Sequence, residues 1–213
     1  MNKQSDVFLS SLDFSDMALD DLLNQLSPML RSHSRRVAIC TAIMAECADK
    51  LLPPYTAPSE TSMATIAYLG GTCHDLGKLL IPNPCKDKHE YMLHPIIGKQ
   101  LLEANIHSLF NNQVQANIVL DIIQYHHERP DGRGFPMGSY GKDIPLTAGL
   151  CAIANWLDHR IYPEKWNPSD INVILNDAKA LEGSYFFESV VACFEYAWPQ
   201  LITRYAEWDQ SEQ

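Results

Sequence analysis

Imidazole and carboxylate groups recur in five separate stretches of this sequence, and in four of them they lie on or near an apolar helical face. The stretches are His33, the pair His74-Asp75, His94, the pair His126-His127, and residues 155–158. One buried histidine is usually a hydrogen-bonded core residue, but several together leave many buried polar atoms without partners. Divalent ions that share a carboxylate satisfy these atoms together, so the sequence predicts two ions around Asp75. Nitrogen and oxygen ligands without thiolate suit Fe, Mn or Zn.

Helical periodicity dominates the segments that carry these groups, and no strand alternation or hairpin signal accompanies it. Ser27-Pro28 begins the first helix as an N-cap with a first-turn proline, and Pro95 predicts a kink or fresh start just after His94. The expected fold class is all-α, a helical bundle. The predicted helices cover residues 27–51, 59–75, 90–105, 113–128, 145–157, 167–183 and 184 to the C-terminal region.

Breaks between the predicted helices follow from glycine and proline. Gly77 is the expected terminator of the second helix, and Asn167-Pro168 caps the sixth. Residues 129–143 are rich in glycine and proline and form a loop. One domain is expected over residues 27–213, with residues 1–26 as an N-terminal segment that carries a short helix.

The 213-residue chain has a net charge of −10, which argues against broad electrostatic binding to DNA, RNA or anionic membranes. No apolar run is long enough to cross a membrane, and no basic start precedes an apolar stretch, so we expect a cytoplasmic protein. The cysteines show no CxxC spacing, and most have apolar neighbours. Free, buried thiols are therefore expected at Cys40, Cys47, Cys73, Cys85, Cys151 and Cys193.

Four strings of this sequence resemble the HD-GYP family of HD-domain phosphohydrolases. They are HSRRVA at 33–38, HDLGK at 74–78, HP at 94–95 followed by Gly98, and HHERPDGRGFP at 126–136. The HD pair alone is weak evidence, but the last string at that distance behind HDLGK is specific. The resemblance extends from about His33 to Tyr162. It implies an HD-type helical bundle, an iron or manganese centre, and a phosphodiesterase that cleaves cyclic di-GMP to linear pGpG or GMP with a metal-activated hydroxide.

The resemblance also implies a role for each matching residue. Asp75 bridges the ions, and Lys78, one turn past the HD pair, contacts the phosphate. Arg160 is the candidate substrate-binding arginine if a gap is allowed in a shortened arginine string. Met29 stands where trinuclear relatives place a glutamate, which favours two ions over three. The implied metal ligands are His33, His74, Asp75, His94, His126, His127 and Asn155.

Two departures from the family pattern leave alternatives open. Asn155 replaces the first acid of an ADxxDA-like string, so its amide oxygen can coordinate but brings no charge. Asp158 either substitutes for it in part or is an acid that is solvated or contacts a ligand. The loop reads Gly134-Phe135-Pro136 instead of GYP, which keeps aromatic packing and loses a hydroxyl. The alternatives are a catalytically weakened nucleotide-binding module that contacts a protein partner through this loop, and an HD phosphohydrolase for another nucleotide.

Other polar and aromatic residues carry weaker signals. His89, His107 and His159 fall outside the motifs and are expected on the surface. The pair Arg35-Arg36 is placed to meet phosphate, although a charged helix surface has the same pattern. Aromatic residues near the C-terminus, such as Trp198, are expected to form a packing face of the last helix.

Overall fold

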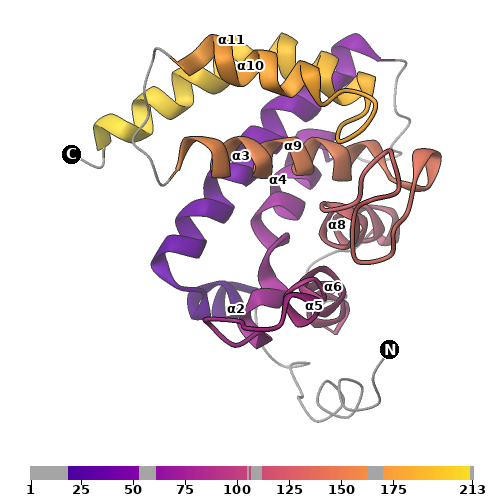
Figure 1. The fold of residues 1–213 in the computed structure, drawn as a ribbon. Helices are drawn as coiled ribbons and strands as arrows, with labels where there is room; N and C mark the ends of the chain where they lie inside the picture. The colour runs from indigo at the N-terminus through magenta and orange to yellow at the C-terminus, as the bar shows by residue number, and fades with distance from the viewer. Residues whose placement is uncertain (1–18, 53–60, 105, 107–111, 163–169, 212–213) are drawn as a thin grey trace.

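The computed structural model describes residues 19–52, 61–104, 106, 112–162 and 170–211, and it confirms the all-α prediction (Figure 1). These residues contain no β-strand, and their one isolated bridge joins Glu182 and Phe186. None of the described helices is both long and apolar enough to span a membrane. The elements in chain order are α2 (Leu19–Gln25), α3 (Pro28–Leu51), α4 (Met63–Cys73), the 3-10 helix η1 (Leu76–Leu80), α5 (Lys88–Tyr91), α6 (His94–Glu103), α8 (Gln113–Tyr125), the 3-10 helix η2 (Gly141–Asp143), α9 (Leu146–Ile161), α10 (Ile171–Ala180) and α11 (Glu188–Ser211).

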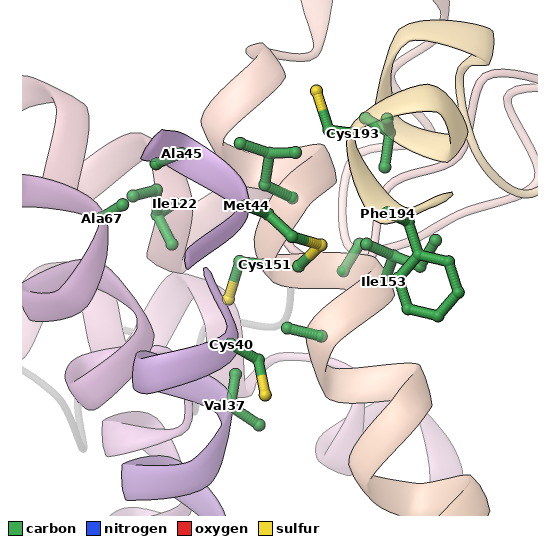
Figure 2. Close-up of a cluster of buried hydrophobic side chains, with 14 of the residues drawn as sticks. Val37, Cys40, Met44, Ala45, Ala67, Ile122, Cys151, Ile153, Cys193 and Phe194 are labelled. Carbon is green, nitrogen blue, oxygen red and sulfur yellow. The ribbon is translucent and has the colours of Figure 1, made fainter. Parts of the chain in front are cut away.

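The long helix α3 is the axis of the bundle. It packs against α4, α9 and α11, and α11 forms with α10 the layer at the top of Figure 1. The main core lies between these helices and includes the fully buried Met44, Ile122, Ile153 and Phe194 (Figure 2). This shared core fixes where the ends of α4, α8 and α9 meet.

A smaller core joins α2 to η1 and α6, in the lower part of Figure 1. Leu22 of α2 is fully buried in it, together with Leu76 of η1 and Ile97 and Leu101 of α6. The short helix expected near the N-terminus is therefore packed against the elements that follow the HD pair.

The predicted starts of two helices are confirmed. Ser27 caps α3 through its Oγ, which accepts a hydrogen bond of 3.3 Å from the Leu30 backbone N–H. The segment around His94 is split, because α5 ends at Tyr91 and α6 begins afresh at His94 with Pro95 in its first turn. Proline at this position needs no hydrogen bond to its nitrogen, so it starts the helix without cost.

Other helix ends differ from the prediction. α4 begins at Met63 behind the N-cap Ser62, later than residue 59, because the Ser62 hydroxyl is the one that accepts from a first-turn N–H. α11 begins at Glu188 rather than Ser184. The predicted cap at Asn167-Pro168 lies outside the described residues.

Gly77 is not the helix terminator that its position predicts. α4 ends at Cys73, and Gly77 lies inside η1 without the positive φ found at Gly132 and three other glycines. A Cβ atom at Gly77 would overlap the His94 carbonyl group and lie 2.5 Å from the Gly98 nitrogen. The two glycines therefore let η1 and α6 approach backbone to backbone.

All six cysteines are free, and every one except the half-buried Cys85 is buried, which confirms the expected free thiols. Burial raises the pKa of Cys40 and of Cys73 to about 12. These thiols therefore stay protonated near neutral pH and act as small apolar core residues.

Candidate metal centre

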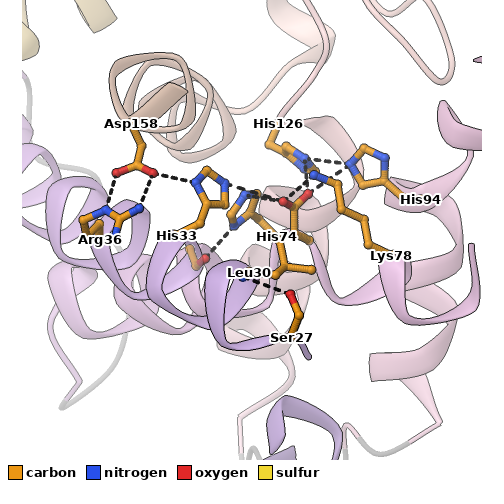
Figure 3. A network of polar contacts seen from close by, with 11 residues as sticks. Ser27, Leu30, His33, Arg36, His74, Lys78, His94, His126 and Asp158 are labelled. Atoms are coloured by element: carbon orange, nitrogen blue, oxygen red, sulfur yellow. Dashed lines mark hydrogen bonds and ion pairs between the residues drawn. The ribbon is translucent and has the colours of Figure 1, made fainter. Parts of the chain in front are cut away.

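Asp75 lies at the centre of a cluster that brings together the six motif residues expected to bind metal. Figure 3 labels four of them, His33, His74, His94 and His126. The side chains are buried, apart from the partly buried His127. They reach the cluster from the ends or first turns of separate helices, where side chains of distant segments can converge. The contributions are His33 from α3, His74 and Asp75 after α4, His94 from α6, and His126 and His127 after α8.

The two oxygens of the Asp75 carboxylate face different histidines. Oδ1 lies 3.2 Å from His94 Nε2 and 3.9 Å from His126 Nε2. Oδ2 lies 3.4 Å from His74 Nε2 and 3.6 Å from His33 Nε2. One carboxylate therefore stands between two groups of imidazoles, which is the arrangement that a bridging ligand requires.

The other ring nitrogen of these imidazoles fixes the tautomer. Nδ1 of His74, His94 and His126 lies 2.7, 2.8 and 2.8 Å from the carbonyl oxygen of the residue three positions earlier. A carbonyl oxygen only accepts, so Nδ1 carries the proton and Nε2 turns a lone pair toward Asp75. The Nε2 atoms of His94 and His126 are 3.3 Å apart. A cation between them would remove the repulsion of their lone pairs.

Several buried atoms of the cluster that could bind a metal have no hydrogen-bond partner. They are Nε2 of His33, His74 and His127, and Oδ1 of Asp75. Buried polar atoms are normally hydrogen-bonded, so four such atoms without a partner in one place indicate a site for a cation. The donor atoms form two sets, each within 4.8 Å: Asp75 with His94, His126 and His127, and Asp75 with His33 and His74. These residues fit a divalent metal.

Burial and neighbouring charges together set the protonation states of the cluster. Burial lowers the pKa of His74, and it lowers the pKa of His126 and His127 well below the usual 6.5. Burial alone would raise the pKa of Asp75, but His74 and Lys78 outweigh it and hold that pKa well below its usual range. The Lys78 Nζ lies 2.6 Å from Asp75 Oδ2. The neutral imidazoles of His74, His126 and His127 thus stand beside one ionised carboxylate, the protonation states that metal binding needs.

A family model described as HD domain matches residues 30–160 of this chain. The chain belongs to the HD domain family. HD domains bind divalent metals, and the cluster around Asp75, which lies entirely within the matched residues, supplies the donor atoms for them. The match ends before α10 and α11, which lie on the C-terminal side of the matched segment.

Curated relatives of this HD domain are named as cyclic dinucleotide phosphodiesterases. A cyclic di-GMP phosphodiesterase of Pseudomonas aeruginosa is 28% identical over 65% of this chain and 33% of its own length. A cyclic di-GMP phosphodiesterase response regulator of Xanthomonas campestris is 37% identical over 47% of this chain and 29% of its own length. A 3′3′-cGAMP-specific phosphodiesterase of Vibrio cholerae is 26% identical over 85% and 35%. The chain thus spans about a third of the length of these relatives, whose names agree with the HD-GYP resemblance.

The glycine-rich loop of the HD domain folds back on the cluster. The Phe135 ring stacks on the His127 imidazole, with 4.4 Å between centroids and 25° between planes, which confirms the aromatic packing expected of Phe135. The Phe135 N–H also donates to the His127 carbonyl over 3.1 Å. Glu128 Oε1 accepts a bond of 2.7 Å from the Met137 N–H. A Cβ at Gly134 would lie 2.5 Å from the Glu128 Cα, so only glycine permits this fold-back.

Helix α9 carries two further candidate residues of the site, Asn155 and Asp158. Asn155 is buried and its Oδ1 has no hydrogen-bond partner, the condition expected of a ligand atom, although its role as a ligand stays a prediction. Asp158 is not solvated: it is 1% exposed and its Oδ2 lies 2.7 Å from His33 Nδ1. Of the interpretations left open for Asp158, contact with a ligand is the one that the geometry matches.

Arg160, the expected substrate-binding arginine, is not brought to the cluster. It pairs with Asp177 of α10, and its guanidinium carbon lies 5.9 Å from the centroid of the Trp156 ring. Two positions along a helix turn a side chain to nearly the opposite face, so Arg160 points away when Asp158 points toward His33.

The three histidines outside the motifs have different outcomes. His89 is exposed, as expected, and His107 lies outside the described residues. His159 is also exposed, but its ring centroid lies only 4.7 Å from that of His33. Partial burial lowers the pKa of His159 to about 4, and His33 lowers it further in the same direction. His159 is therefore a neutral group beside the cluster rather than an ordinary surface histidine.

A groove of about 1040 Å³ opens next to the cluster on the side of His33 and Lys78. Its walls come from the start of α3, residues 81–85 and the end of α9. Apolar side chains line it together with the cationic Arg36 and Lys78 and the neutral His159. Pockets for small ligands commonly have about 300–1,000 Å³, so this groove is large enough for a dinucleotide.

Sequence reasoning did not assign two tyrosines at this site. Tyr91 lines the groove, and the centroid of its ring lies 5.3 Å from Lys78 Nζ. Its backbone carbonyl oxygen accepts a hydrogen bond from His94 Nδ1. Its place three residues before a histidine is a signal that could have found it. The Tyr205 hydroxyl donates to Asp158 Oδ1 over 2.9 Å from helix α11. Nothing local in the sequence marks Tyr205, which looks like any aromatic residue of a packing face.

Proposed function

We propose that this HD domain hydrolyses a phosphodiester bond of a cyclic dinucleotide, with cyclic di-GMP as the first candidate and linear pGpG or GMP as the product. The observation that carries the proposal is the position of Asp75, which directs one oxygen to each of two histidine sets beside a large groove. The names of the three relatives support this substrate class.

The cofactor in this proposal is a pair of divalent ions. Nitrogen and oxygen donors suit Fe, Mn or Zn, and the HD-GYP resemblance implies Fe or Mn among these. Asp75 would be shared by both ions, and each of the two histidine sets described above would hold one of them. Asn155 is a further candidate ligand, because its buried Oδ1 has no partner. Met29, 83% exposed at the edge of the groove, offers no oxygen for a third ion.

Divalent ions in this centre supply Lewis-acid chemistry, which acidifies water and neutralises negative charge on a phosphoryl group. The side chains of the protein supply orientation and charge. Lys78 holds its ammonium between Asp75 and the groove, where it can donate to a phosphoryl oxygen as charge develops during displacement. Phe135 holds the ring of His127 in one orientation by stacking on it.

Two alternatives rest on particular observations. The amide of Asn155 brings no negative charge, which favours a weakened enzyme or a module that binds the nucleotide without cleaving it. The relative from Vibrio cholerae, which covers most of this chain, favours 3′3′-cGAMP over cyclic di-GMP as the substrate.

The glycine-rich loop is the proposed contact for a protein partner. Its residues Phe135 and Pro136 are only partly exposed, whereas Met137 is 61% and Tyr140 is 67% exposed. Large apolar side chains exposed in the same loop are a feature of protein contact sites. Met137→Ser and Tyr140→Ser should therefore weaken such a contact without disturbing the stacking of Phe135 on His127.

The experiment combines anaerobic metal analysis with product analysis. The purified protein is incubated separately with cyclic di-GMP and 3′3′-cGAMP, and the products are resolved by chromatography. We expect two divalent ions per chain and turnover that stops when they are chelated. Asp75→Asn should lose both, whereas Asp49→Asn, an exposed position on α3, should lose neither. Tight nucleotide binding without product would support the binding module, and a large gain in Asn155→Asp would support the weakened enzyme.

A further inference from the structure

The imidazoles of the cluster are oriented in two different ways (Figure 3). His74, His94 and His126 each donate Nδ1–H to a backbone carbonyl three residues earlier. His33 instead has its Nδ1 2.7 Å from a carboxylate oxygen of Asp158, which lies 125 residues away in the sequence. Among the described Nδ1 contacts of these four rings, only that of His33 is made to a side chain, and only that one joins segments distant in the sequence.

Asp158 is itself held in place from two directions. Arg36 donates from Nε to Oδ1 over 2.7 Å and from its terminal nitrogen to Oδ2 over 3.0 Å. The Tyr205 hydroxyl donates to Oδ1 over 2.9 Å. Both side chains are at least nine-tenths buried, as is Asp158. The carboxylate therefore cannot rotate away from His33 without breaking charge-assisted bonds in the core.

We propose that Asp158 is a positioning residue for His33 and that Tyr205, on the C-terminal helix α11, belongs to the same device. This inference rests on the proposed metal centre. An ionised carboxylate accepts only, so it places the His33 proton on Nδ1 and leaves the Nε2 lone pair directed at Asp75 Oδ2. It also makes the imidazole a stronger donor than a carbonyl does, because it stabilises positive charge on the ring.

The device divides the centre into unequal halves. The set of His33 and His74 depends on α11 through Tyr205, whereas the set of His94, His126 and His127 has no such link among the described contacts. Helix α11 lies beyond the matched residues 30–160. The C-terminal helix is therefore part of the metal site in this chain and not only a cover for the core.

The first test reads the tautomer of His33 without metal. Long-range ¹H–¹⁵N spectra of the histidine-labelled, metal-free protein should show His33 protonated at Nδ1, with its signals assigned from a His33→Gln variant. Asp158→Asn should shift His33 toward a mixture of tautomers, because an amide can accept from Nδ1 or donate to it. Tyr205→Phe should produce a smaller shift of the same kind, and Tyr125→Phe on α8 should produce none.

The second test measures metal affinity by titration with Mn²⁺ under anaerobic conditions. Asp158→Asn should lower the affinity for one of the two ions by about 10- to 100-fold and leave the affinity for the other unchanged. This is the usual effect of losing a group that orients a ligand. Tyr205→Phe should weaken the same ion less. Unchanged His33 signals and unchanged affinity in both variants, or an equal weakening of both ions, would overturn the proposal.

Asp158→Asn leaves Arg36 short of its partner and can fail to fold, since an unpaired buried charge is costly. Tyr205→Phe then decides, because it removes one hydroxyl and keeps the Arg36–Asp158 pair. The outcomes also separate this inference from the proposed function. A wild-type protein that binds metal but cleaves no cyclic dinucleotide refutes the function alone, while the spectra of the metal-free protein test the orientation of His33 independently.

Discussion

The close approach of the backbones of η1 and α6 at Gly77 predicts the effect of one added methyl group. In Gly77→Ala the new Cβ would overlap the His94 carbonyl and lie 2.5 Å from the Gly98 nitrogen, whereas ordinary contacts begin at 3.4 Å. Both atoms belong to the backbone of α6, so η1 and α6 must separate by roughly 1 Å, because packed interiors hold no spare space. The distance of 3.2 Å between His94 Nε2 and Asp75 Oδ1 then lengthens toward about 4 Å.

Overpacking of this kind costs about 1–3 kcal/mol, which lowers Tm by about 2–12 °C for a chain of this size. Misplacing a ligand by about 1 Å should lower turnover on the order of 100-fold. Thermal unfolding, metal stoichiometry and turnover are measured together. Gly141→Ala is the matched control, since its Cβ meets nothing within 4 Å and only the positive φ of 55° is strained. It should lower the free energy of unfolding by about 1–2 kcal/mol, and so Tm by about 2–8 °C, while metal content and activity are kept. Normal metal content in Gly77→Ala would refute the reasoning.

Two further predictions concern charge in the cluster. Lys78→Met removes an ammonium 2.6 Å from Asp75 Oδ2. Metal binding should become about tenfold tighter, equivalent to one unit of pKa, and turnover should fall by about 100-fold. Calorimetry measures the metal affinity, and a fall in both affinity and turnover would contradict the prediction. For pH, the folded-state pKa of His126 and of His127 lies well below 6.5, so the unfolded state takes up protons first as pH falls below 6.5. The stability of the metal-free protein should be full above pH 6.5 and decrease below it by up to about 1.4 kcal/mol per pH unit for each imidazole. Urea unfolding at pH 7.5, 6.5 and 5.5 measures this change. Equal free energies of unfolding at the three pH values would show that these rings take up protons as readily in the folded state as in the unfolded state.

The two halves of the centre suggest different sensitivities to damage elsewhere in the protein. In the set around His94, the rings of His94 and His126 are oriented by backbone carbonyls three residues earlier, so these two rings should keep their orientation as long as the local backbone is formed. The set around His33 needs Asp158 and Arg36 in place, and these need the packing of α9 and α11 against α3. Changes in the C-terminal helix should therefore affect the ion at His33 before the other.

The sequence alone predicted the all-α class, the starts of α3 and α6, and the cluster of six side chains. Helical periodicity with Ser27 and Pro95 at helix starts reports local backbone preferences, which tertiary packing did not override. The histidines and Asp75 were recognisable because buried imidazoles in such numbers need a common partner. Phe135 kept its expected packing role because an aromatic ring, with or without a hydroxyl, can stack on His127.

Only the tertiary structure decided how these groups are held and which neighbours serve them. Asp158 and Arg160 stand two positions apart on α9, and the packing of that helix turns one toward His33 and the other toward Asp177. Gly77 looked like a helix end because sequence does not reveal that another backbone lies against it. The bond from Tyr205 to Asp158 depends on how α11 lies across α3 and α9, a relation between distant segments that no local pattern encodes.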